Sequence, residues 1–424
     1  MLTDLAGKRV LTFNSVVRVN QIEVTRERVE GKDEAEIHTP EAVRALRDAF
    51  RAGWPGATMT WALSWRALHD ERPQYRAIRD LLRTYHEQEG DDVTFIPGGY
   101  FAPMYNERDQ INRDLHEGLA RVQEIVGGGY RPTSVVAGFL PADCLAYLAD
   151  VEDVHVCQGS VWSQYAIDNG DGDGSISYPY YPSREHFCKA AQSSHDFIDC
   201  VNLDGWTVDF VAARYAGATR TYNSRMGVGP IETIGRYGPE VGVRQMLDTT
   251  AVHFGDGLTR NGFGWVTNCW EISLVDGVGH LEALTAWLKG IRQRWPDAVC
   301  CNLGEFGEAW RREHQNNDGL NYAFYQRGTG LGGSEAHLEV RWYMNQHFRL
   351  ALIRDWQADG EWQVLDLTRY TLPASEPQGM GRNWSLMGDI NQKGTRPQDR
   401  PRPFGELGQE LQRTVLTTYP DLEV

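Results

Sequence analysis

The sequence predicts a parallel α/β barrel of the (β/α)7 or (β/α)8 type, followed by a smaller antiparallel β-rich domain. Short apolar runs rich in β-branched and aromatic residues alternate with amphipathic segments through most of the chain. The strand–helix–strand order of residues 263–310 is that of a βαβ unit, whose strands are parallel. From about Asn316 the pattern changes to strands without long helices. We therefore expect a catalytic barrel domain over residues 1–315 and a β-rich domain over residues 316–424.

The elements before residue 263 follow the strand–helix order that a parallel barrel requires. Thr39 is a good N-cap for the first helix and Pro40 suits its first position. The polar stretch before that helix reads as a surface loop. Strands are expected at residues 8–19, 58–65, 92–97, 134–140, 154–162 and 196–203. Helices are expected at residues 39–50, 73–87, 110–126, 141–149 and 236–252.

Residues 263–310 contain the leading candidate carboxylates. An apolar strand ends at Glu271, and a second apolar run at 298–303 is followed closely by Glu305 and Glu308. The carboxyl ends of parallel strands meet at one rim, where ligands bind in such folds. We therefore expect these carboxylates to share that rim.

The neighbours of these carboxylates suggest a sugar site. Trp270 and Trp310 offer aromatic faces for a pyranose ring, and acids act on the glycosidic bond. Each Glu could equally cap a helix or pair with Arg311 or Arg312.

A second strand ends in the same way, with an acid beside an aromatic residue, at Asn202-Leu-Asp-Gly-Trp206. Asp204 and Glu271 are thus the best-placed pair for acid–base catalysis. Other residues on predicted strand ends or loops could bind hydroxyls, stack on a ring or position an anionic group, or could be structural: Asn14, Trp65, Gln158, Trp162, Tyr180, Tyr181, Trp206, Trp270 and Arg225.

Composition limits the kinds of partner. The 42 basic and 58 acidic residues give a net charge of −16, which argues against nucleic acid or an anionic membrane as a partner. The 14 Trp, 18 Tyr and 44 Gly favour aromatic stacking platforms on glycine-rich loops, or alternatively a large aromatic core. A small saccharide or glycoside is the expected ligand.

The sequence predicts a cytoplasmic protein. The N-terminus has no apolar segment of the signal-peptide type, and no run approaches membrane-spanning length. The seven cysteines are odd in number and lie mostly in apolar strands, which favours reduced, buried thiols.

Motifs for nucleotide, metal or serine-hydrolase chemistry are missing. The acidic loop at residues 169–175 resembles half of a calcium site, but Tyr180 takes the place of the bidentate Glu at position 12, so a flexible loop over the active site is expected. There is no HExxH, HxxxH or GxSxG motif, and Gly227-Val-Gly-Pro230 lacks a P-loop lysine. No cofactor is expected, with a divalent cation as the one left open.

Several motifs resemble those of an uncharacterised bacterial family in the glycoside hydrolase/deacetylase superfamily. They are Thr60-Trp-Ala-Leu-Ser-Trp-Arg66, Phe139-Leu-Pro-Ala-Asp143, residues 164–174, Val201-Asn-Leu-Asp-Gly-Trp206 and residues 223–232. The resemblance covers nearly the whole chain and implies a (β/α)7-type barrel with a small β-rich C-terminal domain.

The superfamily offers two kinds of chemistry. Its polysaccharide deacetylases have a Thr-Phe-Asp-Asp-Gly metal motif on the first strand, where this chain has Thr12-Phe-Asn-Ser-Val16 without either acid. Its glycosidases use two strand-end carboxylates, which this chain can supply.

The working hypothesis is a glycoside hydrolase. Glu271 and Asp204 would share the acid, base or nucleophile roles, with Glu305 and Glu308 as substitutes. The alternatives are a deacetylase-like enzyme or lyase acting on sugars, and a sugar-binding barrel without catalysis.

Overall fold

The structure is a computed structural model of the chain. It describes residues 2–23, 29–161, 165–167, 170–171, 174–213, 226–275, 277–381, 384–386, 401–420, 422 and 424.

Strand β1 (Arg9–Val17) is the central strand of a parallel sheet. It pairs with β13 (Gly264–Glu271) on one side and with β4 (Thr60–Leu63) on the other, and β4 pairs in turn with β5 (Asp92–Phe95). The short strand β14 (Val299–Cys301) also pairs with β1, near its start.

A second parallel sheet has the order β12-β7-β6, and hydrogen bonds link its two edges to the first sheet. Its strands are β6 (Val135–Val136), β7 (Val156–Ser160) and β12 (Val201–Asp204). The backbone N–H of Phe101 donates to the carbonyl of Ala137 over 3.0 Å, next to β5 and β6. The N–H of Thr207 donates to the carbonyl of Thr267 over 3.0 Å, next to β12 and β13.

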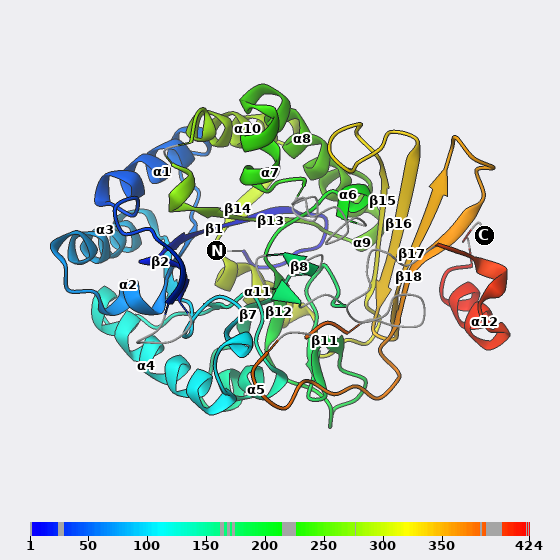
Figure 1. Cartoon of the computed structure of the whole chain (residues 1–424), viewed down its shortest axis with the longest axis horizontal. Coiled ribbons are helices and arrows are strands. Elements are labelled where there is room, and N and C mark those ends of the chain that lie inside the picture. Colours follow the sequence, from blue (N-terminus) through cyan, green and yellow to red (C-terminus); the bar gives the residue numbers. More distant parts are fainter. Residues whose placement is uncertain are drawn as a thin grey trace.

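Helices surround these strands (Figure 1). The apolar face of α1 explains why it packs there: Val43, Leu46 and Phe50 are buried, and the Thr39 hydroxyl accepts a hydrogen bond from the Ala42 N–H. The larger helices are α1 (Pro40–Gly53), α3 (Pro73–Glu89), α4 (Arg108–Val126), α5 (Ala142–Asp150), α8 (Pro239–Val252) and α10 (His280–Arg294).

An antiparallel sheet follows and packs against the parallel part. Its order is β15-β16-β17-β18-β19, and its inner face adds Phe324, Val340 and Trp342 to the main core. Helix α12 (Gln409–Thr418) adds Val415 to a separate apolar cluster with residues of β17 and β18. The strands are β15 (Asn321–Arg327), β16 (Leu338–Asn345), β17 (Phe348–Asp355), β18 (Trp362–Arg369) and β19 (Arg402–Pro403). The predicted combination of a parallel α/β part with an antiparallel C-terminal part is confirmed.

Several elements were not expected from the sequence. The stretch read as a surface loop contains a hairpin, β2 (Asn20–Glu23) and β3 (Val29–Asp33). Helix α11 (Leu303–Glu313) follows β14 directly, because the Asn302 side chain caps it by accepting from the Glu305 N–H over 2.8 Å. Helix α12 and strand β15 were also missed. The remaining elements are α2 (Trp65–His69), α6 (Phe210–Ala213), α7 (Pro230–Tyr237), α9 (Leu258–Asn261), β8 (Tyr165–Ile167), β9 (Gly170–Asp171), β10 (Pro182–Ser183) and β11 (His186–Ala190).

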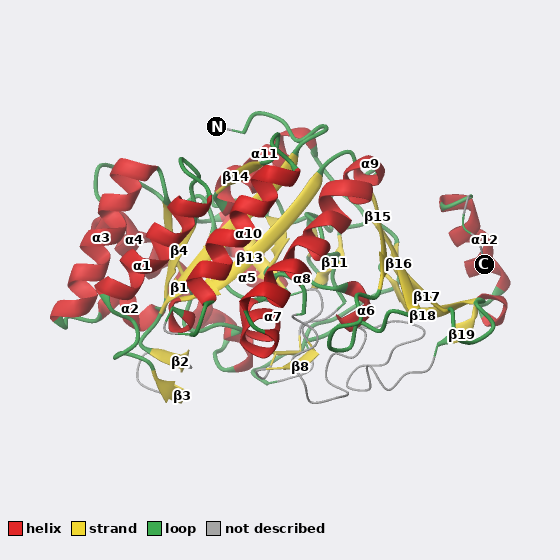
Figure 2. Cartoon of the chain, turned by 90° about the horizontal axis from the view of Figure 1, so that it is seen from above, coloured by secondary structure: helices red, strands yellow, loops and turns green. Residues whose placement is uncertain are grey.

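The parallel strands have two distinct ends (Figure 2). The N-terminus and α11 lie at one end, and the hairpin β2–β3 lies at the opposite end, to which the carboxyl ends of β1 and β13 point. All seven cysteines are buried, and none of them forms a disulfide in the described structure. Within the described residues, no helix has the length and apolar character needed to span a membrane.

A buried ion pair ties α1 to the parallel sheet, and its loss should destabilise the fold. Arg47 donates to Asp91 through Nε (2.8 Å) and Nη2 (3.0 Å), and both side chains are almost fully buried. Arg47→Met would leave Asp91 buried without its cation, so we expect a loss of about 3 kcal/mol or more in the free energy of unfolding. Urea denaturation measures this loss. Arg44→Met removes an exposed partner of Glu41 on the same helix and should cost less than about 1 kcal/mol; equal losses in both variants would contradict this role of the buried pair.

Candidate active site

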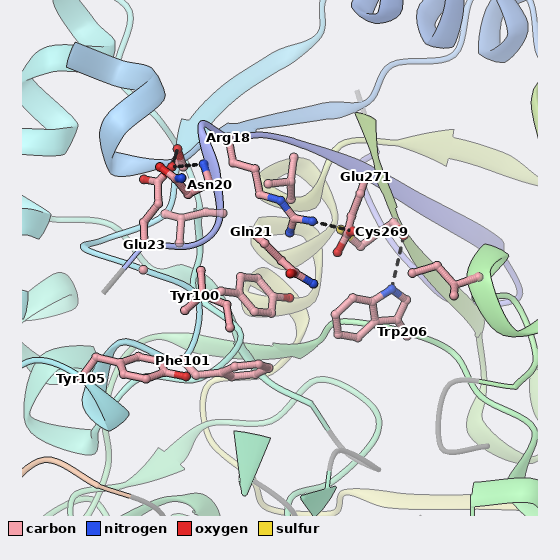
Figure 3. A pocket seen from close by; sticks show the side chains of 16 residues that line it. Arg18, Asn20, Gln21, Glu23, Tyr100, Phe101, Tyr105, Trp206, Cys269 and Glu271 are labelled. Carbon is pink, nitrogen blue, oxygen red and sulfur yellow. Dashed lines mark hydrogen bonds and ion pairs between the residues drawn. The ribbon is translucent and has the colours of Figure 1, made fainter. Parts of the chain in front are cut away.

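A pocket of about 210 Å³ opens at the end of the sheet where β1 and β13 finish (Figure 3). Its polar wall consists of Arg18, Asn20, Gln21, Glu23 and Glu271, with Ser64 beside them. Its aromatic wall consists of Tyr100, Phe101, Tyr105 and Trp206. Smaller groups complete the lining, namely Val16, Ile22, Ile96, Gly99, Ile231 and Cys269.

Glu271 presents one free carboxylate oxygen to this pocket. Its Oε2 accepts hydrogen bonds from Arg18 Nη2 (3.0 Å) and from the Ser273 hydroxyl (3.4 Å). Its Oε1 accepts none from the described residues, and the carboxylate points into the pocket (Figure 3). The side chain is 19% exposed, so a ligand can reach it.

Arg18 holds Glu271 in place from the end of β1. Its Nε donates to Glu34 Oε2 (2.5 Å) and its Nη2 donates to Glu34 Oε1 (3.2 Å) as well as to Glu271. Burial acts to lower the pKa of Arg18, but the adjacent Glu271 and Glu34 carboxylates raise it above the ordinary value. Arg18 is therefore charged, and its Nη1 has no hydrogen-bond partner in the described part of the chain.

Behind Arg18, Glu34 and His38 form a supporting layer. Burial acts to raise the pKa of Glu34, yet the hydrogen bonds from His38 and Arg18 outweigh it and lower this pKa from 4.5 to about 2. Burial lowers the pKa of His38, so its ring is neutral. His38 Nδ1 accepts from the backbone N–H of Arg18 (3.2 Å), which leaves Nε2–H to donate to Glu34 (3.2 Å).

Glu23 is the other carboxylate in the pocket wall, and both of its oxygens accept hydrogen bonds from the protein. It accepts hydrogen bonds from the N–H groups of Val19 (2.9 Å), Asn20 (3.2 Å) and Arg66 (2.8 Å) and from the Ser64 hydroxyl (2.8 Å). These bonds fix the turn after β1 and the start of α2. Glu23 is therefore a structural group, whereas Glu271 keeps an oxygen for a ligand.

The aromatic wall is held by its own contacts. The Tyr100 hydroxyl donates to Gln158 Oε1 (3.0 Å), and the edge of Tyr100 packs against Trp206 at a ring separation of 6.1 Å. Trp206 Nε1 donates to the Cys269 carbonyl (3.3 Å). A β-carbon at Gly138 would lie 2.8 Å from ring carbons of both Tyr100 and Phe101, so only glycine lets these rings sit so close to the strand.

The structure separates the predicted catalytic residues. Glu271 lies in the pocket wall, whereas Asp204 is buried at the end of β12 and accepts from the Gly205 N–H (2.7 Å) without being among the described residues that line the pocket. The expectation that Glu305 and Glu308 share this rim is wrong. Both lie on α11 at the opposite end, where Glu305 accepts from the backbone N–H of Leu2 and Glu308 lies 3.7 Å from Arg311.

Some of the predicted binding residues also lie at the pocket, and others do not. Trp206 lines the pocket, and Gln158 supports it through Tyr100. Trp65 faces a neighbouring surface depression, where its ring packs at a tilt against His69. Trp270 points away from the pocket and stacks on Phe13.

The other described aromatic candidates, Tyr180 and Tyr181, are buried in the core. The Tyr180 hydroxyl donates to the Phe187 carbonyl and the Tyr181 hydroxyl to the His314 carbonyl, both over 2.7 Å, so the expected subsite wall is instead a packed segment. Asn14 is buried on β1. Trp162, Arg225 and parts of the acidic loop at 169–175 lie outside the described residues.

Arg18, Glu34, Tyr100 and Glu23 were not identified from the sequence. The one available signal was the two-residue alternation of β1, which continues from Asn14 through Val16 to Arg18. Among the described residues, no three His, Cys, Asp or Glu side chains gather as metal ligands.

Comparison with known proteins places the chain in a family. Residues 3–344 match the sequence model of DUF3863, a domain of unknown function with a solved structure, and residues 349–422 match the corresponding model of DUF3864. The chain belongs to the DUF3863 family. The crystal structure of a candidate glycoside hydrolase/deacetylase from Parabacteroides distasonis is 45% identical to it, with a TM-score of 0.94 over 100% of both chains. The resemblance found in the sequence motifs is thus confirmed.

More distant structures were also found. A candidate polysaccharide deacetylase from Pseudomonas aeruginosa is 12% identical, with a TM-score of 0.47 over 73% of this chain and 92% of its own. A GH57 branching enzyme from Thermococcus kodakaraensis is 11% identical, with a TM-score of 0.44 over 70% of this chain and 71% of its own. No curated protein matches the chain.

The support that Glu34 gives to this DUF3863 pocket should depend on pH. Because its folded pKa of about 2 is below the ordinary 4.5, its contribution to stability is present above about pH 4.5 and is lost as the pH falls toward 2. Glu34→Gln should therefore lower the free energy of unfolding by about 3 kcal/mol near neutral pH, and by progressively less in acid. Chemical denaturation of both proteins at several pH values measures the difference.

The control is Glu36→Gln, an exposed carboxylate two residues away. It should change stability by less than about 0.5 kcal/mol at every pH. A Glu34→Gln effect that is independent of pH would show that the charge of Glu34 is not what stabilises the fold.

Proposed function

We propose that this protein is a carbohydrate-active enzyme that hydrolyses glycosides, with Glu271 as its central catalytic carboxylate. The observation that carries this proposal is that Glu271 Oε1, in a pocket walled by aromatic rings, accepts no hydrogen bond from the described residues. The description of the Parabacteroides distasonis relative as a candidate glycoside hydrolase/deacetylase supports the same class of substrate.

The ion pair with Arg18 defines the part that Glu271 plays. A carboxylate that is paired with a guanidinium suits the part of nucleophile or base rather than that of proton donor. Its Oε1 would then attack the anomeric carbon or accept a proton from water. Because Arg18 and Ser273 hold Oε2, the carboxylate does not rotate away from the substrate.

Asp204 is our proposed second carboxylate, acting as the acid. It lies at the end of β12, two residues before the pocket residue Trp206.

The pocket walls suit a sugar. Aromatic rings bury the apolar faces of pyranose rings, and Tyr100 and Trp206 bring such rings from different elements to one wall. Polar groups on the opposite wall, chiefly Arg18 and Gln21, would bind hydroxyl groups.

We also propose that the two parallel sheets act together as a (β/α)7-type barrel. The backbone bonds from Phe101 to Ala137 and from Thr207 to Thr267 bring their edges together, and α11 covers the end opposite the pocket. A ligand would enter from the end at which β1 and β13 finish, as in other parallel barrels.

Deacetylation is the alternative chemistry that the same relative's description names. Metal-dependent deacetylases need acidic ligands on the first strand, where this chain has Asn14 and Ser15. The donor atoms of the described residues do not fit such a metal site, which favours the glycosidase.

Glu271→Gln should lower kcat/KM on a cleaved glycoside at least about 100-fold, because the nucleophile or base is lost. Asp204→Asn should give a loss of the same order. The measurement is a screen of nitrophenyl glycosides and acetylated sugars that detects nitrophenol and acetate separately. Glu308→Gln, on α11 at the far end, should keep wild-type turnover.

The outcomes are distinct. Unchanged turnover in both Glu271→Gln and Asp204→Asn would remove the catalytic assignment. Release of acetate without nitrophenol would identify a deacetylase. Sugar binding without either product would identify a sugar-binding barrel.

A further inference from the structure

Asn14 is an unusual residue in the middle of β1. Its side chain is 1% exposed, and neither Oδ1 nor Nδ2 makes a hydrogen bond within the described structure. A buried carboxamide with both ends unpaired costs free energy, so its presence requires an explanation.

The register of the strands shows which way this side chain points. Asn14 is the direct partner of Cys269 on β13 and lies two residues before Val16 on β1. Cys269 and Val16 both line the pocket. Paired residues of adjacent strands, and residues two apart on one strand, project from the same face of a sheet. The carboxamide of Asn14 therefore projects from the same face of the sheet as these two lining residues, and it lies behind the lining because Asn14 itself is buried and does not line the pocket.

The polar side chains of Thr12, Thr60 and Gln158, which also lie on the parallel strands, each make hydrogen bonds. The Thr12 hydroxyl accepts from Trp265 Nε1 (3.0 Å), and the Thr60 hydroxyl accepts from the Leu303 N–H (3.0 Å). Gln158 accepts from the Tyr100 hydroxyl (3.0 Å) and donates to the Ser160 carbonyl (2.8 Å). Single unpaired atoms occur elsewhere in these strands, at Asn202 Oδ1, Asn268 Oδ1 and Trp270 Nε1, but Asn14 has both of its polar atoms unpaired within the described residues.

We propose that Asn14 is the polar floor of the pocket and binds a pair of adjacent hydroxyl groups on a neutral sugar ring. A carboxamide offers one acceptor and one donor group, and two vicinal hydroxyls match both. An anion would pair only with Nδ2 and a cation only with Oδ1. The proposal rests on the proposed function for the class of ligand, and it adds a specificity-determining residue below Glu271.

If Asn14 binds the ligand, its replacement should weaken sugar binding without destabilising the free protein. The loss of a structural residue would instead lower the stability. Asn14→Leu keeps the approximate size of the side chain and removes both unpaired atoms, so the free protein should melt at the same temperature as wild type or higher. The same change should weaken sugar binding at least about tenfold. Asn14→Ala, which adds no bulk, should show the same loss of binding.

The matched control is Asn268→Leu. Asn268 is equally buried on the adjacent strand β13, but it projects from the opposite face and donates through Nδ2 to the Val228 carbonyl (2.9 Å). Its replacement should lower the melting temperature and leave binding unchanged.

The probes are glucose, galactose and mannose, with their nitrophenyl glycosides and monodeoxy analogues, and binding is followed by calorimetry and thermal shift. We expect one deoxy analogue to bind wild type as weakly as its parent sugar binds Asn14→Leu. Normal binding to Asn14→Leu and Asn14→Ala would overturn the inference, as would a wild-type protein that binds none of these sugars.

The two proposals fail separately. If Glu271→Gln abolishes turnover while the Asn14 variants bind sugar normally, the proposed hydrolase activity is supported and the proposed role of Asn14 is wrong. If the Asn14 variants lose sugar binding but the wild-type protein cleaves no glycoside, the proposed role of Asn14 is supported and the proposed hydrolase activity is wrong.

Discussion

The structure of the pocket depends on the need to neutralise one buried guanidinium. Arg18 comes from the end of β1, and its charge is balanced by Glu34, just before α1, and by Glu271, at the end of β13. Transferring an ion out of water costs several kcal/mol, so a buried cation persists only when such partners are held close. The three side chains consequently fix three segments against one another. Among the described residues, Nη1 of Arg18 and Oε1 of Glu271 make no hydrogen bond, so one could donate to a ligand and the other could accept from it.

The two-residue period of a strand then decides which side chains reach the pocket. On β13, Cys269 and Glu271 face it, whereas Trp270 packs on Phe13 under the helices. Glu271 could be found from the sequence because a strand end is visible as the end of an apolar run. Trp270 is next to Glu271 in the sequence, but its side chain projects from the opposite face of the sheet and cannot reach the pocket. Strict alternation would have excluded it.

The other errors arise from interactions between distant parts of the chain. Glu305 and Glu308 were placed at the rim because the capping of α11 by Asn302, which ends the strand at Cys301, was not recognised. The alternation of β1 points to Arg18, but not to its role, because its partner Glu271 lies 253 residues away along the chain. Glu34 pairs with Arg18 and His38 from a segment whose sequence is typical of a polar loop. The fold class was easier to predict. It rests on the order of many apolar segments, whereas a site rests on single side chains, each of which has a structural use as well.

The two asparagines of the paired strands β1 and β13 illustrate how stability and function separate in this protein. Asn268 contributes to the fold because it ties β13 to the segment before α7 through the Val228 carbonyl. Asn14 contributes nothing comparable, and an unpaired buried amide costs about 1–3 kcal/mol. Selection for stability alone would favour an apolar residue of similar size at position 14. By keeping an amide whose two polar atoms are both unpaired among the described residues, the protein gives up stability at an interior position where a bound hydroxyl could recover it.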